Sequence, residues 1–497
     1  MGREVERNRF TRSDRAVFRE RLRQSLPVLA EVLRAPGFGT VERTVGAELE
    51  LFLVDRRMGP ACAAEPVRED AGDARLAPEV DRFNLEVNLT PVPLAGEPFS
   101  AMAGEIGEVL GKVAVPAGRH GAAPLLIGTL PTLTPADLGP AALTPQPRFH
   151  ALERAMAGRR ATPYAIDLTG DENLRLHAES IAVQGAVCSW QVHLVVPPGE
   201  FARTYNAAQL ATGPVLAVAG NSPLLLGRRL WQETRVPMYE HGFGDRPAPP
   251  RTGGPPRTGG PPRVGFGPAW LEGGALELFD AAVRDHDVLL PFPSDGAPGQ
   301  RTEGRLPGLE ELRLHLSTVW WWNRPVYDPG GHLRIEFRAL PSGPTVVDMA
   351  ANAALLLGLT AHLAEHVDVP AALPFARARE NFYRAARYGP HARLWWPDGG
   401  GGRPVAEHPA PRLVTGLLPA AFRGLSALGV ARGEAARLLE TVADRAASGI
   451  TGAVWQRRAL DRLQQRFERR AALRELTARY RQLSAEGAPI HTWPLPR

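Results

Sequence analysis

Four short stretches of this chain carry acidic, basic and histidine side chains on one side of an apolar–polar alternation. They are residues 46–52 (GAELELF), 83–89 (FNLEVNL), 190–194 (WQVHL) and 333–339 (LRIEFRA). Successive side chains of a β-strand point to opposite faces, so each stretch predicts a strand with one apolar and one polar face. A polar face of glutamate, histidine and arginine indicates a site for a divalent metal ion and phosphate.

The glutamates of the first two stretches are candidate metal ligands. Glu48 and Glu50 lie two residues apart, so their carboxylates share a face and repel each other unless a cation or an arginine lies between them. Glu86 lies between Asn84 and Asn88, whose amides could orient its carboxylate. Mg²⁺ prefers oxygen ligands and is often held by one or two carboxylates together with substrate phosphates.

The other two stretches add a histidine and two arginines. His193 shares its face with Gln191, which favours the wall of a polar pocket over a lone structural histidine. Glu336 lies between Arg334 and Arg338, so its carboxylate could bind a metal while the guanidinium groups neutralise phosphate oxygens. A ladder of ion pairs is the structural alternative, and the coincidence of four such strands favours a site.

Arg235 is a further candidate outside the four strands. It follows Thr234, shortly after the turn at residues 221–223. Its guanidinium could clamp a carboxylate or a phosphate. The chain is rich in arginine, however, and on the residues alone a structural role is favoured for Arg235.

The elements between these strands predict an α+β fold. Apolar periodicity predicts helices at residues 11–34, 200–218 (interrupted at 213–214), 309–321 and 345–366, and further strands at 124–129 and 181–187. Strands with one polar face suit a sheet covered by helices on one face. A doubly wound parallel sheet would instead have apolar strands throughout.

Two domains are predicted, with a boundary near residue 373. Residues 1–373 would form the sheet domain, and residues 374–497 a helical C-terminal region that closes with an arginine-rich helix at 454–484. Residues 246–263 contain two near copies of RTGGPP, which cannot form a core and predict a surface loop inserted into the first domain. Residues 398–404 are a second glycine-rich break.

Composition excludes several classes of protein. Lys112 is the only lysine among 58 lysine and arginine residues, and no GxxxxGK[ST] string is present, which argues against a P-loop enzyme or a kinase. The net charge of +5 comes without a basic block, so nucleic acid is not expected as a partner. Two cysteines offer neither a zinc motif nor a disulfide framework. The absence of a signal peptide and of a 20-residue apolar run predicts a cytoplasmic protein without a membrane span.

Several of these motifs together resemble the glutamate–cysteine ligase family, in the branch of plant-type and bacterial carboxylate–amine ligases. The resemblance extends in short islands from about residue 40 to 465. The matching segments are Gly46-x-Glu48-x-Glu50 (the family's GxExE), Gln191-Val192-His193 (its HVH or QVN strand), residues 219–223 (its ANSP turn), the strand at 334–338, the helix that begins near Asp348, and residues 452–457. The family pattern often has histidine at the position of Gln191.

The resemblance implies a glutamine synthetase-like fold, whose curved and mostly antiparallel sheet holds ATP and magnesium on its concave face. It implies that Arg334 and Arg338 contact the transferred phosphate, and that Arg235, Gln191 and Asn221 contact the substrate. The metal, Mg²⁺ or Mn²⁺, would be held by the ligands Glu48, Glu50, Glu86, His193 and Glu336.

The implied reaction needs no lysine or cysteine nucleophile. ATP would phosphorylate a side-chain carboxylate, and an amine would displace phosphate from the acyl phosphate. Glutamate and cysteine are the expected substrates, and a homo-oligomer is left open. Three alternatives remain at this point: a ligase with another acid or amine, a metal-dependent phosphohydrolase, and a non-catalytic binding protein with the same fold.

Overall fold

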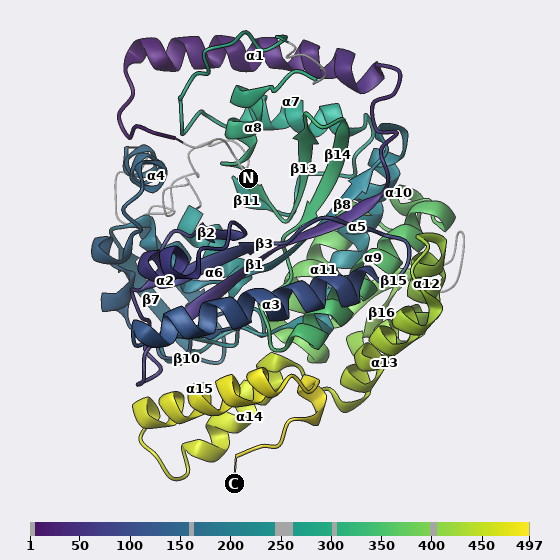
Figure 1. The fold of residues 1–497 in the computed structure, drawn as a ribbon. Coiled ribbons are helices and arrows are strands. Elements are labelled where there is room, and N and C mark those ends of the chain that lie inside the picture. Colours follow the sequence, from purple (N-terminus) through teal and green to yellow (C-terminus); the bar gives the residue numbers. More distant parts are fainter. Residues whose placement is uncertain (1–4, 159–163, 244–261, 301–305, 398–404, 497) are drawn as a thin grey trace, which may run out of the picture.

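The centre of the molecule is a curved antiparallel sheet (Figure 1), seen in a computed structural model that describes residues 5–158, 164–243, 262–300, 306–397 and 405–496. The strand order is β13-β14-β8-β1-β3-β2, and β4 and β5 also pair with β1. The strands are β1 (Thr44–Val54), β2 (Leu76–Pro78), β3 (Asn84–Asn88), β4 (Val92–Pro93), β5 (Ala123–Leu125), β8 (Trp190–Val196), β13 (Asn323–Asp328) and β14 (His332–Phe337).

The four stretches singled out in the sequence form four consecutive strands of this sheet, β14, β8, β1 and β3. In the antiparallel register Glu48 pairs with Gln191, and Glu50 pairs with Glu86. Directly opposite residues point to the same face of a sheet. The four polar faces therefore merge into one continuous surface, as predicted.

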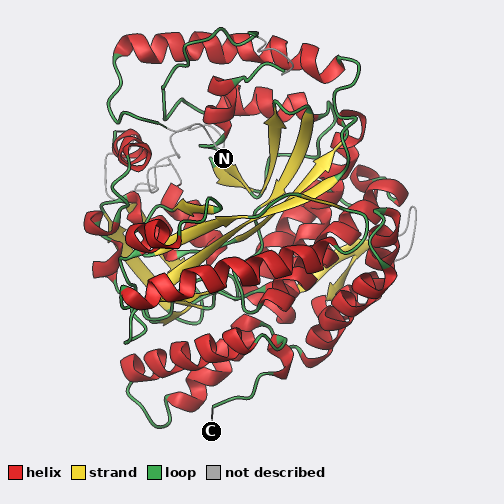
Figure 2. Ribbon diagram, viewed as in Figure 1, coloured by secondary structure: helices red, strands yellow, loops and turns green. Residues whose placement is uncertain are grey.

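Helices cover the apolar face of the sheet, where α3, α5 and α9 contact β1, β13 and β8 (Figure 2). Leu49, Leu51 and Leu53 of β1 are fully buried there. The prediction of an α+β fold with a curved antiparallel sheet and helices packed on one face is confirmed.

The helices of the described chain are α1 (Arg12–Arg34), α2 (Ala64–Ala71), α3 (Pro98–Arg119), α4 (Pro147–Ala157), α5 (Phe201–Ala219), α6 (Arg235–Phe243), α7 (Ala275–Asp285), α8 (Glu310–Leu316), α9 (Val346–His366), α10 (Val369–Ala372), α11 (Phe375–Tyr388), α12 (Ala410–Ala427), α13 (Arg432–Ser448), α14 (Gly452–Leu463) and α15 (Arg469–Glu486). The smaller two-stranded pairs are β6–β7 (Tyr164–Thr169, Asn173–Ala178), β9–β10 (Leu224–Leu225, Arg228–Arg229), β11–β12 (Val264–Gly265, Trp320–Trp321) and β15–β16 (Arg393–Pro397, Val405–Pro409).

Three predicted elements differ in the structure. Pro214 does not interrupt α5, which is buried along nearly its whole length and packs against α9 and α11. The helix predicted at 309–321 ends at Leu316, because the Thr318 hydroxyl donates to the carbonyl of His315 and the chain then enters β12. Residues 181–186 form a 3₁₀ helix, not a strand; the Ser180 hydroxyl caps it by accepting from the N–H of Ala182.

The C-terminal part is mainly helical, as expected, but it also contains the β15–β16 hairpin. α12 and α13 pack against α9, and the segment predicted as one helix at 454–484 is the pair α14 and α15 (yellow in Figure 1). The domain boundary near residue 373 stays a prediction. Two glycine-rich stretches lie outside the described residues: residues 246–261 of the predicted loop and the whole of the second segment, residues 398–404. Arg263 is fully buried, so the predicted surface loop does not extend to residue 263.

α9 is the one described helix that is long and apolar enough to cross a membrane. Its apolar stretch is 78% buried inside the protein. α5, α12 and α13 surround it, so its composition is explained by its place in the core.

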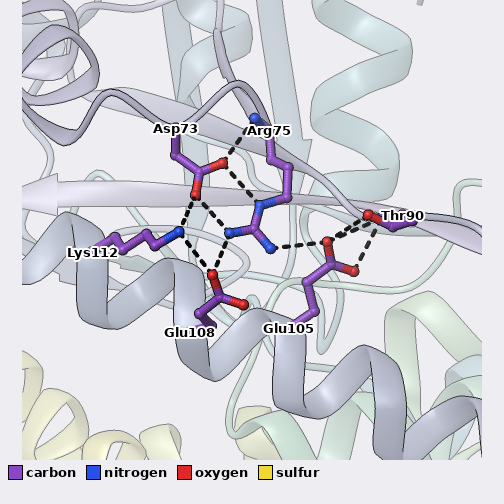
Figure 3. A network of polar contacts seen from close by, with 6 residues as sticks. All are labelled: Asp73, Arg75, Thr90, Glu105, Glu108 and Lys112. Carbon is purple, nitrogen blue, oxygen red and sulfur yellow. Dashed lines mark hydrogen bonds and ion pairs between the residues drawn. The ribbon is translucent and has the colours of Figure 1, made fainter.

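A polar network fastens α3 to the edge of the sheet (Figure 3). Arg75, just before β2, donates to Asp73, to Glu105 at 3.1 Å and to Glu108 at 2.9 Å. Lys112, the only lysine, donates to Asp73 at 3.1 Å. The Arg75 carbonyl accepts from the N–H of Asn88 at 2.8 Å, which ties the network to β3.

We predict that Arg75→Met lowers the free energy of unfolding by about 1–2 kcal/mol, because it leaves three carboxylates around one site without their common partner. The matched control is Arg68→Met, which removes one partly exposed pair with Glu65 on α2 and should cost at most about 0.5 kcal/mol. Denaturant unfolding of both variants measures the difference. Equal losses would show that the network adds nothing beyond a single surface pair.

Candidate active site

The polar face of the sheet forms the floor of a pocket of about 290 Å³. Residues 77–80 and side chains from α4, α6, α7 and α8 form its walls. Its charged and amide lining is Glu48, Glu50, Glu79, Glu86, Gln146, Arg148, Gln191, Arg313, Arg324, Arg334, Glu336 and Arg338. Aromatic and aliphatic side chains such as Phe149, Phe243 and Trp320 line the remainder.

Glu50, Glu79 and Glu86 form a first cluster that could hold a metal ion, with one oxygen from each within 4.8 Å of the others. Burial, followed by repulsion from Glu79, raises the pKa of Glu50 to about 7. Burial and the neighbouring carboxylates also raise the pKa of Glu86 well above its usual value. Asn88 donates to Glu86 at 2.8 Å, the orienting role expected for its amide. Asn84, by contrast, points to the Cys188 sulfur.

Glu48, His193 and Glu336 form a second cluster of the same kind. Nε2 of His193 lies 3.7 Å from a Glu48 oxygen and has no hydrogen-bond partner among the described residues. Burial lowers the pKa of His193 to about 4, so the imidazole is neutral at physiological pH, as a metal ligand must be.

Gln191 lies between the first cluster and Arg338. Its Nε2 donates to Glu50 at 2.9 Å, and its Oε1 accepts from Nη1 of Arg338. Nη1 of Arg338 also pairs with Glu336, and the Tyr239 hydroxyl contacts the same guanidinium. Gln191 therefore fixes the spacing between a cluster carboxylate and an arginine that faces the pocket. It also lines the pocket, and its predicted contact with substrate stays a prediction.

Three arginines that the sequence did not single out also line the pocket: Arg148, Arg313 and Arg324. Arg324 of β13 pairs opposite Glu336 and donates to both of its oxygens, at 2.7 and 2.8 Å. Although burial opposes ionisation, the charges of Arg324 and Arg338 hold the pKa of Glu336 well below its usual range. Arg148 of α4 also lines the pocket, and burial lowers its pKa. Arg334 faces the pocket while donating to Asp328 at 2.9 Å.

The two clusters fit hard divalent cations. Five carboxylates and one neutral imidazole form the donor set, and oxygen-rich sets of this kind suit Mg²⁺ or Mn²⁺. Burial first, and then the repulsion between neighbouring carboxylates, raises the pKa of Glu50 and Glu86, and a cation would relieve that repulsion. Next to them, Arg338 and Arg334 offer guanidinium groups to an anionic ligand.

Two predicted substrate contacts, Arg235 and Asn221, lie beneath the pocket and do not line it. Arg235 is 1% exposed; it pairs with Glu233 at 3.1 Å and donates to the carbonyls of Arg338 and Ala339. Asn221 is fully buried and donates to the Ser342 carbonyl at 2.7 Å. Both side chains support the chain after β14, although Nε of Arg235 has no hydrogen-bond partner among the described residues. Their predicted contact with substrate stays a prediction.

Glu79 was missed because it follows β2 in a segment without regular alternation. Strand pairing could have identified it, because the edge strand β2 pairs with β3 and so places Glu79 beside Glu86. Arg324 lies in the sequence WWWNRPVYD, where the proline at 325 argues against a strand. As β13 is the edge strand of the sheet, the proline is tolerated there.

The fold and the pocket define a class of proteins. Its members are α+β proteins with a curved antiparallel sheet, whose concave face is acidic and lined by arginines. The sequence model of the protein family named glutamate–cysteine ligase family 2 matches residues 44–479 of this chain. The chain belongs to this family, and the resemblance seen in the motifs is confirmed.

Individual relatives agree with the family over shorter stretches. Proteins of Frankia casuarinae and Frankia alni, both carrying the provisional name glutamate–cysteine ligase 2-1, are 31% and 36% identical to this chain over 137 and 143 residues. Each match covers 27% of this chain and 35% of the relative, so it spans about a third of the relatives' length.

A solved structure extends the comparison to the whole fold. The glutamate–cysteine ligase of Francisella tularensis, determined in complex with AMP, superposes with a TM-score of 0.54 over 93% of this chain and 91% of its own, at 11% identity. At this identity the likeness shows the fold, and it confirms the predicted ligase fold.

We predict that the protein binds two Mn²⁺ ions, one per cluster. Glu79→Gln and Glu48→Gln should each lower the stoichiometry by one, because each removes a charged ligand from a different cluster. Calorimetric titration and electron paramagnetic resonance would count the ions. Glu240→Gln is the matched control: Glu240 is another enclosed acid, but it bonds to Tyr383 outside the clusters and should leave both ions in place. A single ion in the unaltered protein would contradict the two-cluster reading.

We also predict that cation affinity rises by about tenfold from about pH 6 to about pH 8. With a pKa of about 7, Glu50 is mostly protonated at the lower pH, and a cation must displace that proton. His193, with a pKa of about 4, stays neutral across this range and adds no dependence. Titrations in two buffers with different ionisation heats would count the released protons. Binding that is independent of pH and releases no proton would contradict the assignment.

Proposed function

We propose that this protein is an ATP- and magnesium-dependent ligase that joins the side-chain carboxylate of glutamate to the amine of cysteine through an acyl phosphate. The observation that carries the proposal is the meeting of two carboxylate clusters with Arg324, Arg334 and Arg338 in one pocket. Such a set suits phosphoryl transfer, which needs charge neutralisation and alignment more than a protein nucleophile.

Family membership supports the choice of reaction and substrates. The similar proteins of Frankia and Francisella are named as glutamate–cysteine ligases. The pocket lining agrees with such chemistry, since the described residues that form it include no lysine and no cysteine. ATP, Mg²⁺ or Mn²⁺ and two amino acids are therefore the proposed ligands, and the cytoplasm is the proposed compartment.

In this scheme the chain's own residues hold charge in place. When bound, the divalent cations would neutralise the phosphate chain of ATP. Glu50, Glu79 and Glu86 would hold a cation on one side of the pocket. Glu48, His193 and Glu336 would hold a cation on the other side. Arg338 would donate to the phosphoryl oxygens as negative charge develops there. Gln191 and Glu336 hold its guanidinium, so little reorganisation is needed during the transfer.

The amine then attacks the acyl carbon, and phosphate leaves with the electrons of the broken C–O bond. The amine must lose a proton as the amide forms. Glu50, whose pKa burial raises to about 7, lies in the pocket and would accept it. A phosphohydrolase would use the same carboxylates with water in place of the amine, so the products decide between the two.

We predict that hydroxylamine replaces the natural amine, because it is a small and strong nucleophile that needs no binding pocket. With ATP, Mg²⁺ and glutamate it should give a hydroxamate and ADP in equal amounts. Arg338→Gln should lower this rate by about 10²–10³-fold, the usual cost of losing one donor to a developing charge. Arg458→Gln, an exposed change on α14, is the control and should leave the rate unaltered.

The products separate the alternatives. Formation of AMP and pyrophosphate would show that the acid is activated as an adenylate and not as an acyl phosphate. Phosphate release without hydroxamate, for every acid tried, would favour the phosphohydrolase. Hydroxamate from an acid other than glutamate would keep the reaction class and change the substrate.

A further inference from the structure

A second cavity, of about 610 Å³, lies away from the candidate active site. It shares no lining residue with the first pocket. The turn after β1, residues 131–137, the β9–β10 turn and the beginning of α15 form its walls. These segments are far apart in sequence, so the cavity exists only in the folded chain.

Five arginines line this cavity: Arg57, Arg228, Arg469, Arg470 and Arg474. Only two of them have an acidic partner among the described residues, and they share it. Arg469 pairs with Glu172, and Arg228 lies 3.8 Å from the same carboxylate. For the guanidinium groups of Arg57, Arg470 and Arg474, no hydrogen bond or ion pair is found in the described part of the chain.

The two carboxylates in the lining, Asp55 and Asp137, offset only part of the charge of five arginines, and each is hydrogen-bonded within its own turn. Asp55 accepts from the N–H groups of Arg57 and Gly59, at 2.7 and 2.8 Å. Asp137 accepts from the N–H and the hydroxyl of Thr134, at 2.8 and 2.7 Å. The lining therefore keeps an excess of positive charge, and three of its guanidinium groups have no ion pair within the described residues. A multivalent anion would convert the repulsion among these groups into attraction.

The cavity is also linked to the candidate active site through α15. Tyr480, two turns beyond the arginines on the same helix, donates to the Leu126 carbonyl at 3.0 Å and accepts from Asn221 at 2.8 Å. The N–H of Asn221 donates to Glu233 at 2.9 Å. Glu233 pairs with Arg235, which donates to the carbonyl of Arg338. A continuous chain of buried polar contacts thus runs from the arginine-bearing helix to the main chain of a residue in the pocket.

We propose that this cavity is an effector site for a small multivalent oxyanion, and that α15 transmits its occupancy to Arg338. Phosphate and carboxylate oxygens both match the guanidinium fork, so the ligand is a polyphosphate, a phosphate ester or a polycarboxylate. Binding at this site does not depend on the proposed ligase activity. Only the transmitted effect rests on that function.

The binding test uses tripolyphosphate and citrate as probes of the two oxygen chemistries. Without metal or nucleotide, thermal shift and calorimetry should detect one of them on the unaltered protein, and Arg470→Gln/Arg474→Gln should weaken that binding at least tenfold. The control double variant, Arg458→Gln/Arg462→Gln, removes the same charge from exposed positions of α14 outside the cavity and should bind normally.

Arg57→Gln, on the opposite wall, is a second variant that leaves α15 untouched and should weaken binding several-fold. Whichever probe loses affinity identifies the oxyanion class. Equal binding by the unaltered protein, the cavity variants and the control would overturn the proposal, as would the absence of any binding.

The transmission test measures ADP formation with free Mg²⁺ held constant. The bound anion should change the turnover of the unaltered protein, and Arg470→Gln/Arg474→Gln should keep the basal rate but lose the response. Tyr480→Phe should still bind the anion and lose the response. An anion effect that persists in Tyr480→Phe would overturn transmission through α15. If no acid or amine supports turnover, the proposed function fails while the binding test still decides on the site.

Discussion

Negative charge confined to one face of a covered sheet is the constraint on which the structure depends. Five glutamates approach within the reach of two cations, and burial makes their mutual repulsion costly. The protein offsets part of this with Arg324 and Arg338, which both pair with Glu336. The cluster of Glu50, Glu79 and Glu86 has no such pairing within it, and burial followed by repulsion between its carboxylates raises the pKa of Glu50 and Glu86.

The rest of the architecture keeps these charges from moving apart. On the apolar face, helices hold β1 and its neighbours, and leucines of β1 that alternate with the glutamates are fully buried. At the edge, the network around Arg75 fastens β2 and β3 to α3, and these are the strands that bring Glu79 and Glu86 together. Cluster geometry is therefore a consequence of how the strands are anchored outside the pocket.

Beneath the pocket, buried polar side chains support the segment that follows β14. Arg235 holds the carbonyls of Arg338 and Ala339, and Asn221 holds that of Ser342. Removing one partner of such a buried set leaves the other unsatisfied, which costs more than the bond contributes. The ANSP-like turn of this chain thus supports the segment after β14, and its predicted contact with substrate through Asn221 stays a prediction.

The sequence by itself determined the elements whose signal is local. A period of two over a few residues decides which side chains share a strand face, and this identified β1, β3, β8 and β14 with Glu48, Glu50, Glu86, His193 and Glu336. Only the tertiary structure decided which strands are neighbours, and so that Glu79 joins Glu50, that Arg324 neutralises Glu336 and that Gln191 bridges Glu50 and Arg338. It also decided that Arg235 is enclosed. These contacts join residues that are far apart in the sequence and that strand pairing and packing bring together. A pattern within a short window of sequence therefore cannot predict them.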